Sequence, residues 1–255
     1  MYEILRHLPA SARVLDIGCR FGSFDASEFP FTTVRLDLEP GRFVNFVQAD
    51  AAALPFPAHS FDAVIANHSL EHFAELDRAL AEIGRVVKPA GALFVAVPDA
   101  STFTDRLYRW LSRGGGHVNA FVSPDALACR IERVTSLPHV GTRVLHTSLS
   151  FLNPRNRTAP APRRLWILAG GREPVLVGLN FFLRLADRLF GTRWSVYGWA
   201  LWFGRPGELP DTRPAWHVCV RCGAGHSTGS LIRRPLRWLC PACGAANLFL
   251  SGPQS

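Results

Sequence analysis

Five short apolar runs in the first 99 residues constrain the fold of this chain more than any other feature. Val, Ile and Leu dominate these runs, which suits strands buried on both faces of a parallel sheet. They occupy residues 13–18, 33–37, 46–50, 61–67 and 92–97. Between the last two runs, apolar residues recur every three or four positions and predict a helix over 70–87, with Ser69 as its N-cap. Strands alternating with helical or turn segments predict a doubly wound α/β sheet.

The second half of the chain gives weaker patterns. Helices are expected over 101–113, 124–136 and 175–190, strands over 140–152 and 194–203, and a loop over 153–164. The mostly apolar helix 175–190 carries a stripe with Arg184 and Arg188, so it could complete the core, cover a ligand pocket or lie on a lipid surface. Completion of the core is the more common role of such a segment.

A chain of 255 residues has room for one full α/β domain and a small appendage. No apolar run approaches the length of a membrane span, and the opening residues 1–6 lack the character of a signal peptide. We therefore expect a cytoplasmic protein without a membrane span.

The positive charge of the chain is concentrated in its last hundred residues. The formal net charge is +8, of which residues 1–153 contribute −2, residues 154–211 contribute +5 and residues 212–255 contribute +5. Any anionic partner is therefore expected to meet the C-terminal part.

Four cysteines near the C-terminus have the spacing of a structural zinc site. Two pairs, each with two intervening residues, are separated by 17 residues, and a Gly follows each pair; the ligands would be Cys219, Cys222, Cys240 and Cys243. The sequence thus predicts a zinc ribbon over 215–249 after a linker at 205–214. Removal of the zinc would be expected to unfold residues 215–249 alone. His217 and His226 are alternative ligands, and Cys19 and Cys129 are interpreted as packing residues.

Residues 212–255, which include the ribbon, contain five Arg, no acidic residue and two Trp, Trp216 and Trp238. This composition suits contacts to phosphates with stacking of bases. Alternatively, the ribbon packs on the rest of the chain or on a protein partner.

Acidic and small residues stand where the predicted strands end. Asp16 and Gly18 with Gly22 form a turn after the first strand, at the sheet edge where doubly wound folds bind ligands. Asp37, 21 residues after Asp16, can accept hydrogen bonds from both ribose hydroxyls of a nucleoside. After the third strand, Asp50 could accept a hydrogen bond from an adenine amino group, with the Ala51 N–H facing the ring. Asn67, at the end of the fourth strand, would line the pocket.

Taken in order, these segments resemble the class I S-adenosylmethionine-dependent methyltransferases, closest to the small-molecule group. The resemblance rests on residues 14–19 (VLDIGC), 50–57 (DAAALPFP), 60–64 (SFDAV), 69–72 (SLEH) and 82–91 (EIGRVVKPAG). It is strong over residues 11–99 and loose over 100–204. It implies a Rossmann-like methyltransferase domain over 1–204, in which Asp16, Gly18 and Gly22 hold the methionine end of the cofactor, Asp37 the ribose and Asp50 the adenine. The chain departs from the family at Arg20, where a Gly is usual, and in the short stretch between Asp37 and Asp50.

Methyl transfer from a sulfonium depends chiefly on alignment of the reactants, so a general base is optional. For a hydroxyl acceptor, His68 and His117 are the candidate catalytic residues, while His72 is expected to make a structural contact.

The predicted function is methyl transfer to a small-molecule, glycan or lipid-linked acceptor. Two alternatives remain open from the sequence: an RNA methyltransferase that uses the basic ribbon as a substrate clamp, and a non-catalytic scaffolding protein on the same fold. The sequence leaves the identity of the acceptor and the oligomeric state undetermined.

Overall fold

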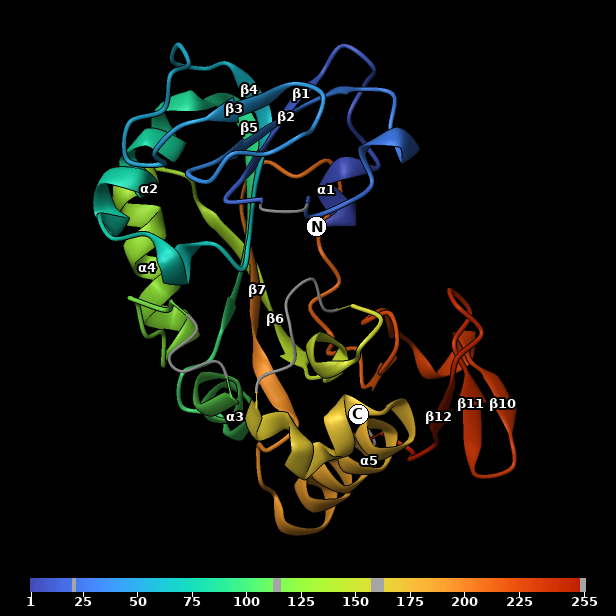
Figure 1. Cartoon of the computed structure of the whole chain (residues 1–255). Helices are drawn as coiled ribbons and strands as arrows, with labels where there is room; N and C mark the ends of the chain where they lie inside the picture. Colours follow the sequence, from blue (N-terminus) through green and yellow to red (C-terminus); the bar gives the residue numbers. More distant parts are fainter. Residues whose placement is uncertain (20–21, 112–115, 157–162, 253–255) are drawn as a thin grey trace. The chain divides into compact units, whose positions relative to one another are not determined.

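The computed structural model describes residues 1–19, 22–111, 116–156 and 163–252 (Figure 1). The chain forms two compact units. Unit 1 consists of residues 1–99, 116–143 and 199–212, and unit 2 of residues 100–115, 144–198 and 213–255. Two strands, β6 (His139–His146) and β7 (Val196–Gly204), are divided between the units.

Unit 1 is built on the predicted parallel sheet. Its strands are β1 (Arg13–Ile17), β2 (Thr32–Asp37), β3 (Phe46–Gln48), β4 (Phe61–Asn67) and β5 (Val87–Pro98). The seven-stranded sheet has the order β3-β2-β1-β4-β5-β7-β6, and neighbours among the first five strands pair in parallel. This confirms the Rossmann-like α/β fold, because the first five strands follow the doubly wound order.

The helices of unit 1 are α1 (Tyr2–Leu5), η1 (Ala26–Glu28), η2 (Leu70–His72), α2 (Leu76–Val86) and α4 (Pro124–Thr135). Helices α2 and α4 pack side by side, as Figure 1 shows. The apolar face of α2, including Leu80 and Ile83, is buried. Helix α4 begins at Pro124, where the Ser123 hydroxyl accepts a hydrogen bond from the Ala126 N–H.

The expectation of a single helix over 70–87 is wrong. Residues 70–72 form one 3-10 turn, and α2 begins only at Leu76. Ser69 makes no side-chain capping bond. At the other end, α2 passes directly into β5 at Val87, so Pro89-Ala90-Gly91 lies within a strand and does not form a separate turn.

Unit 2 contains α3 (Phe103–Leu111), η3 (Ser150–Leu152), η4 (Arg163–Gly171) and α5 (Glu173–Phe190). Its cysteine-rich part contains two small antiparallel sheets. The first consists of β8 (His217–Val218) and β9 (Gly225–His226), and the second of β10 (Ile232–Arg234), β11 (Arg237–Leu239) and β12 (Ala246–Leu248). The 3-10 turn η5 (Thr228–Ser230) lies between them in the sequence. One apolar cluster joins α5, through Leu176 and Leu183, to Val220 of this part. Helix α5 therefore contributes to the core of unit 2, as the sequence favoured.

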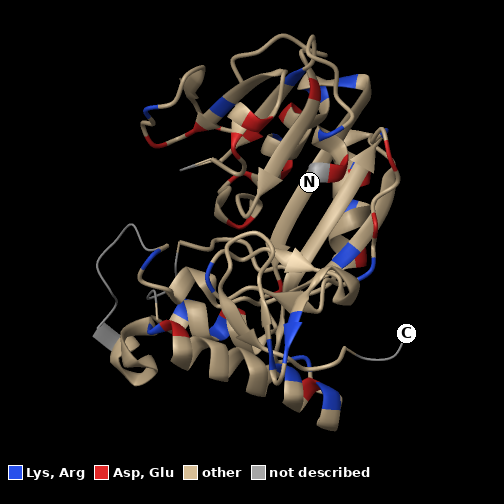
Figure 2. Ribbon diagram, turned by 90° about the vertical axis from the view of Figure 1, so that its right-hand side faces the viewer, with Lys and Arg blue, Asp and Glu red and all other residues tan. Residues whose placement is uncertain are grey.

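The two units carry opposite charge. Unit 1 has 12 basic and 17 acidic residues, and unit 2 has 16 basic and three acidic residues. Figure 2 marks these residues in blue and red. Among the residues that the structure describes, no helix combines the length and the apolar character needed to cross a membrane.

Candidate functional site

The turn after β1 has the backbone geometry that the glycines predict. Gly18 has a φ of +63° and Gly22 a φ of +89°, a region that favours glycine. The Gly18 N–H donates to the Leu36 carbonyl at 2.8 Å, and the Gly22 N–H donates to the Cys19 carbonyl at 2.6 Å. The departure at Arg20 lies outside the described residues. The two glycines therefore give the backbone its left-handed bends at the carboxyl end of β1.

Asp16 is fully buried and holds this turn in place. Its two carboxylate oxygens accept hydrogen bonds from the Ser23 N–H at 2.9 Å and the Ser23 hydroxyl at 2.6 Å. The Arg35 Nε lies 3.8 Å from the same carboxylate. Burial raises the pKa of Asp16, while the Ser23 hydrogen bonds and the Arg35 charge oppose the rise. Ser23 and Arg35 shape the turn, and the sequence patterns did not single out either.

The other candidate cofactor residues follow neighbouring strands. In the β1–β2 register Ile17 is opposite Leu36, which places Asp37 beside Gly18. In the β1–β4 register Asp16 is opposite Ile65, which places the strand-end residue Asn67 on the other flank. One Asp37 oxygen accepts from the Glu39 N–H at 3.1 Å.

Asp50 and Ala51 follow β3, the next strand beyond Asp37. The Asp50 Oδ1 accepts from the Ala52 N–H at 2.9 Å, which closes a tight turn at an exposed position. Ala51 is buried within that turn. The structure thus brings the strand-end residues to one edge of the sheet, while their contacts to a cofactor remain predictions.

A second group of polar side chains follows β4. The donor atoms of Glu71, His72 and His117 all lie within 4.8 Å of one another. His68 adjoins them, with its Nδ1 3.7 Å from the Glu71 Oε1. Burial, together with the charges of His117 and His72, lowers the pKa of His68 to about 4. Both predicted catalytic histidines therefore lie in one cluster, together with Glu71, which the sequence patterns did not single out for chemistry.

Backbone contacts hold this cluster together. The N–H groups of Val118 and Asn119 donate to the Glu71 carbonyl at 2.8 and 3.0 Å. The Asn119 side-chain amide donates to the carbonyls of Leu70 and Phe73 at 2.9 and 2.8 Å. His72 makes the structural contact that was expected, because its Nδ1 lies 3.0 Å from the Gly116 carbonyl oxygen.

The four C-terminal cysteines converge in unit 2. Their sulfur atoms lie within 4.8 Å of one another, and the closest pairs, Cys219 with Cys243 and Cys222 with Cys240, are 3.7 Å apart. Within the described residues this group contains neither His217 nor His226. The His226 Nε2 lies 3.2 Å from the Cys240 Sγ, and the His217 Nε2 lies 3.2 Å from the Thr228 hydroxyl.

The two cysteine pairs adopt the same local structure. The Gly223 N–H donates to the Cys219 carbonyl at 2.9 Å, and the Gly244 N–H donates to the Cys240 carbonyl at 2.8 Å. Both glycines have positive φ, +77° and +70°. Each pair thus turns its two thiols to one side, which four-thiolate zinc coordination requires.

The ribbon differs from expectation at Trp238, which is 2% exposed and packs in the ribbon core. It cannot stack on a base from that position. Among the ribbon arginines, Arg221 donates to both carboxylate oxygens of Glu173 at 2.8 and 2.9 Å, and Arg233 lies over the Phe249 ring. Part of the ribbon's positive charge is therefore used within unit 2.

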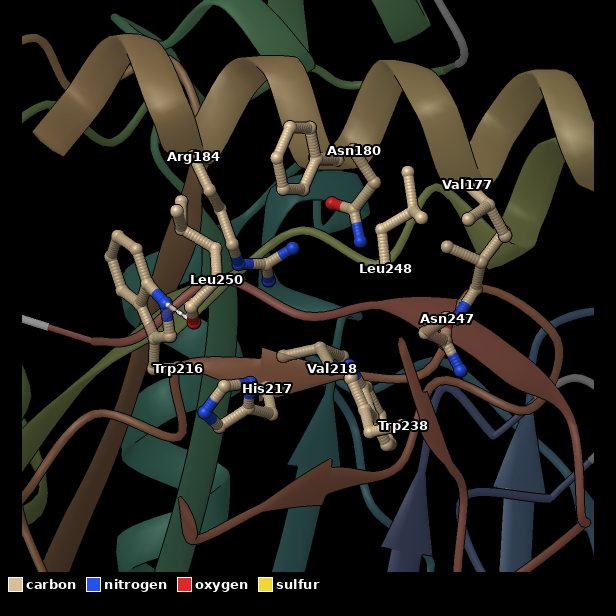
Figure 3. Close-up of a pocket in the computed structure, with 12 residues that line it drawn as sticks. Val177, Asn180, Arg184, Trp216, His217, Val218, Trp238, Asn247, Leu248 and Leu250 are labelled. Atoms are coloured by element: carbon tan, nitrogen blue, oxygen red, sulfur yellow. Dashed lines mark hydrogen bonds between the residues drawn. The ribbon is translucent and has the colours of Figure 1, made fainter. Parts of the chain in front are cut away.

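A small pocket in unit 2 lies between α5 and the ribbon (Figure 3). Asn180 and Arg184 of α5 line one side, and Trp216, His217 and Trp238 line the other. Burial lowers the pKa of Arg184 to about 10, so the guanidinium stays charged at neutral pH, and it donates to the Thr147 carbonyl at 3.0 Å. Arg184 also lies over the Trp216 ring, which is a contact between α5 and the ribbon.

Comparison with known proteins points to methyltransferases. The family described as "Methyltransferase domain" matches residues 10–95. A malonyl-[acyl-carrier protein] O-methyltransferase from Methylococcus capsulatus is 29% identical over 190 residues, which cover 63% of this chain and 69% of that protein. A demethylmenaquinone methyltransferase from Renibacterium salmoninarum is 33% identical over 132 residues, covering 43% of this chain and 56% of that protein.

A solved structure supports the same fold. The crystal structure of a SAM dependent methyltransferase from Archaeoglobus fulgidus aligns with a TM-score of 0.54 at 18% identity, covering 79% of this chain and 88% of that one. The sheet order, the glycine turn and the sequence matches agree. Together they support a class I S-adenosylmethionine-dependent methyltransferase.

Proposed function

We propose that this chain transfers the methyl group of S-adenosylmethionine to a small-molecule, glycan or lipid-linked acceptor. The observation that carries the proposal is the Gly18 turn, flanked in strand register by Asp37 on one side and Asn67 on the other. A ligand with a ribose and a charged amino acid part fits such an edge, because backbone and carboxylate acceptors stand at adjacent strand ends.

The residues present fit the cofactor. Gly18 and Gly22 give the turn its left-handed backbone, and the buried Asp16 carboxylate ties Ser23 to the end of β1. Asp37 would bind the ribose and Asp50 with Ala51 the adenine. Bound S-adenosylmethionine would supply an electrophilic methyl group. The protein's contribution is then to hold the acceptor in line and to exclude water, which accounts for much of the rate in such reactions.

The acceptor side of the site would be formed by the cluster after β4. His68 and His117 stand there with Glu71 and His72. Relatives named for malonyl-[acyl-carrier protein] and demethylmenaquinone favour an acceptor that is small or attached to a carrier. A lipid-linked acceptor also agrees with the large apolar side chains that α5 exposes, among them Phe182 and Phe190, which are 64% and 76% exposed.

We further propose that Cys219, Cys222, Cys240 and Cys243 bind one structural zinc ion. Four thiolates fill a tetrahedral site and leave no position for a substrate. The Asn247 amide lies 3.6 Å from the Cys219 Sγ and can donate to it, while its Oδ1 accepts from the Val220 N–H at 3.0 Å. Such outer contacts orient the first ligands of a metal site.

Calorimetric titration with S-adenosylhomocysteine tests the cofactor site. The zinc-loaded chain should bind it, and Asp37→Ala should raise the Kd at least tenfold, since about 1.4 kcal/mol is lost with two ribose hydrogen bonds. Asp77→Asn is the matched control, because Asp77 lies on the outer face of α2 and pairs with Arg130. Absence of binding up to millimolar concentration would overturn the proposal.

Methyl transfer to RNA is a second candidate, favoured by the charge of unit 2. That unit contains 16 basic residues and only three acidic ones. In its β10–β11 pair, Arg234 lies opposite Arg237. This reading predicts RNA affinity that falls steeply with salt and weakens in the triple variant Arg233→Ala, Arg234→Ala, Arg237→Ala. Binding that is absent or insensitive to salt removes it. A scaffolding protein would instead methylate nothing in a lysate supplied with labelled cofactor.

A further inference from the structure

We propose that Glu71, His72 and His117 form a metal site for a divalent first-row transition ion, separate from the cysteine cluster and beside the cofactor turn. Two imidazoles and one carboxylate are a donor set suited to such ions, and the set leaves coordination positions open. All three residues belong to unit 1, so the site is complete within one compact part of the chain.

The spacing of the donor atoms fits a common ion. The three ligand atoms lie within 4.8 Å of one another. Two bonds of about 2.0–2.2 Å to one ion span up to about 4.4 Å. A ligand atom therefore needs to move by only a few tenths of an ångström for all three to reach one ion. Glu71 is 2% exposed, and a buried carboxylate beside two imidazoles gains from a cation.

The orientation of His72 provides an independent indication. Its Nδ1 lies 3.0 Å from the Gly116 carbonyl oxygen, which can only accept, so Nδ1 carries the proton. On this tautomer, Nε2 is the ring nitrogen whose lone pair would bind the metal. Histidine ligands characteristically donate their second ring N–H to a backbone carbonyl in this way.

The two segments that supply the ligands are held in register before any ion binds. Five hydrogen bonds join residues 70–73 to residues 116–119: two from the N–H groups of Val118 and Asn119 to the Glu71 carbonyl, two from the Asn119 amide, and the one made by His72. The His72 and His117 rings meet edge to face with centroids 4.9 Å apart. A rigid frame of this kind reduces the ordering cost of binding.

The place of the cluster suggests what the open positions hold. Ser69 precedes the ligand segment and abuts Gly18, since a Cβ on Gly18 would lie 2.5 Å from the Ser69 Cβ. The ion would therefore lie near the cofactor turn. Resting on the proposed function, we infer that it binds an acceptor through hydroxyl or carboxylate oxygens. His117 then serves as a ligand, and His68 stands beside the ion through its 3.7 Å approach to Glu71.

Cobalt binding to the zinc-loaded full chain tests the site. Equilibrium dialysis against Co²⁺ should leave one cobalt per chain, with weak visible bands and no thiolate-to-metal charge-transfer band, since the ligands are nitrogen and oxygen. Glu71→Gln keeps the shape of the buried side chain, and His117→Ala changes a loop residue; each should weaken cobalt binding at least tenfold. Circular dichroism and S-adenosylhomocysteine binding show whether each variant is folded.

His59→Asn is the matched control. His59 lies in unit 1 at a positive φ of 56°, which Asn tolerates, and its ring contacts the Val87 carbonyl away from the cluster. The control should bind cobalt as the wild type does. A charge-transfer band, no retained cobalt, or equal retention by the Glu71 and His117 variants would overturn the inference. Cofactor binding without cobalt uptake would refute this site alone, whereas loss of cofactor binding would refute the proposed function.

Discussion

Gly18 and Ser69 approach so closely that a Cβ built on Gly18 would lie 2.5 Å from the Ser69 Cβ. The first residue belongs to the turn after β1, and the second precedes the turn that carries Glu71 and His72. Gly18 also has a φ of +63°. Because Gly18 has no side chain, the proposed cofactor turn can lie directly against the segment that carries the cluster after β4.

Gly18→Ala should weaken cofactor binding and destabilise unit 1. The new methyl group meets the Ser69 Cβ and forces a left-handed backbone on a residue that disfavours it, at a cost of about 1–3 kcal/mol. We expect the Kd for S-adenosylhomocysteine to rise at least tenfold in calorimetry, with a lower midpoint of thermal unfolding.

Gly178→Ala provides the control. Gly178 lies within α5, and nothing stands within 4 Å of a Cβ there. The same substitution should stabilise α5 by about 0.5–1 kcal/mol and leave cofactor binding unchanged. Equal cofactor affinity in the two variants would contradict the role assigned to the Gly18 turn.

His146 should make unit 2 sensitive to acid. Burial and the nearby charge of Arg184 lower the pKa of His146 to about 4, against the opposing charge of Asp187. The folded state thus holds a neutral ring, whose Nδ1 lies 2.9 Å from the Ser195 hydroxyl and which makes an edge-to-face contact with the Trp216 ring. Because the unfolded ring titrates near 6.5, this contribution is complete above that pH and is lost as the pH falls toward 4.

The difference between the wild type and His146→Gln isolates this contribution. Gln keeps a hydrogen-bonding group but does not titrate in this range. Between pH 7 and 4 the wild type should lose of the order of 3 kcal/mol more unfolding free energy than the variant, measured in urea with zinc saturated. Parallel pH profiles would show that the ring is protonated in the folded state.

Local sequence patterns predicted the sheet because most residues of β1, β2, β4 and β5 are apolar and buried. The run 61–67 matches β4 residue for residue, and the helix pattern at 124–136 matches α4 within one residue. The break between η2 and α2 was not predictable from periodicity. It depends on Asn119, which is distant in sequence and binds the carbonyls of Leu70 and Phe73, carbonyls that a continuous helix would use itself.

The candidate sites divide along the same line. The cysteine cluster was predictable, because metal-ligand spacing is recorded in the sequence itself. The strand-end acids were predictable from their order along the chain. The partnership of Glu71 with His117 was not, because only the fold brings residues 46 positions apart together. Likewise, the burial of Trp238 depends on packing against His217 and His226, which composition does not reveal.

Removal of zinc should affect more of unit 2 than the ribbon. The sequence alone predicts a response limited to 215–249, but Val220 belongs to the same apolar cluster as Leu176, and Arg221 is paired with Glu173 at the start of α5. Since zinc binding of about 10–16 kcal/mol is in effect folding energy, its loss should raise hydrogen exchange in the ribbon and in α5. Peptides of β1, β4 and α2 should keep their protection in exchange measured by mass spectrometry.

Cys240→Ser should reproduce this pattern and release the zinc, while His226→Ala should retain one zinc per chain, because His226 lies outside the four-thiol group. Retention of full zinc by Cys240→Ser would refute the ligand set. Protection of α5 unchanged after chelation would restrict the effect to the ribbon and contradict the coupling through Val220 and Arg221.

Alkylation should distinguish the two cysteines outside the ribbon. Cys19 is 5% exposed, and burial together with the charges of Asp16 and Asp37 raises the pKa of its thiol to about 12, whereas Cys129 is exposed on α4. Because the thiolate is the reacting form, iodoacetamide at pH 8 should label Cys129 alone in the zinc-loaded chain, and Cys129 with the four ribbon cysteines after chelation. Peptide mapping identifies the labelled sites, and Cys129→Ser should leave the zinc-loaded chain unlabelled. Labelling of Cys19 before chelation would mean that the turn after β1 opens in the native protein, and it would contradict the burial on which the proposed cofactor turn depends.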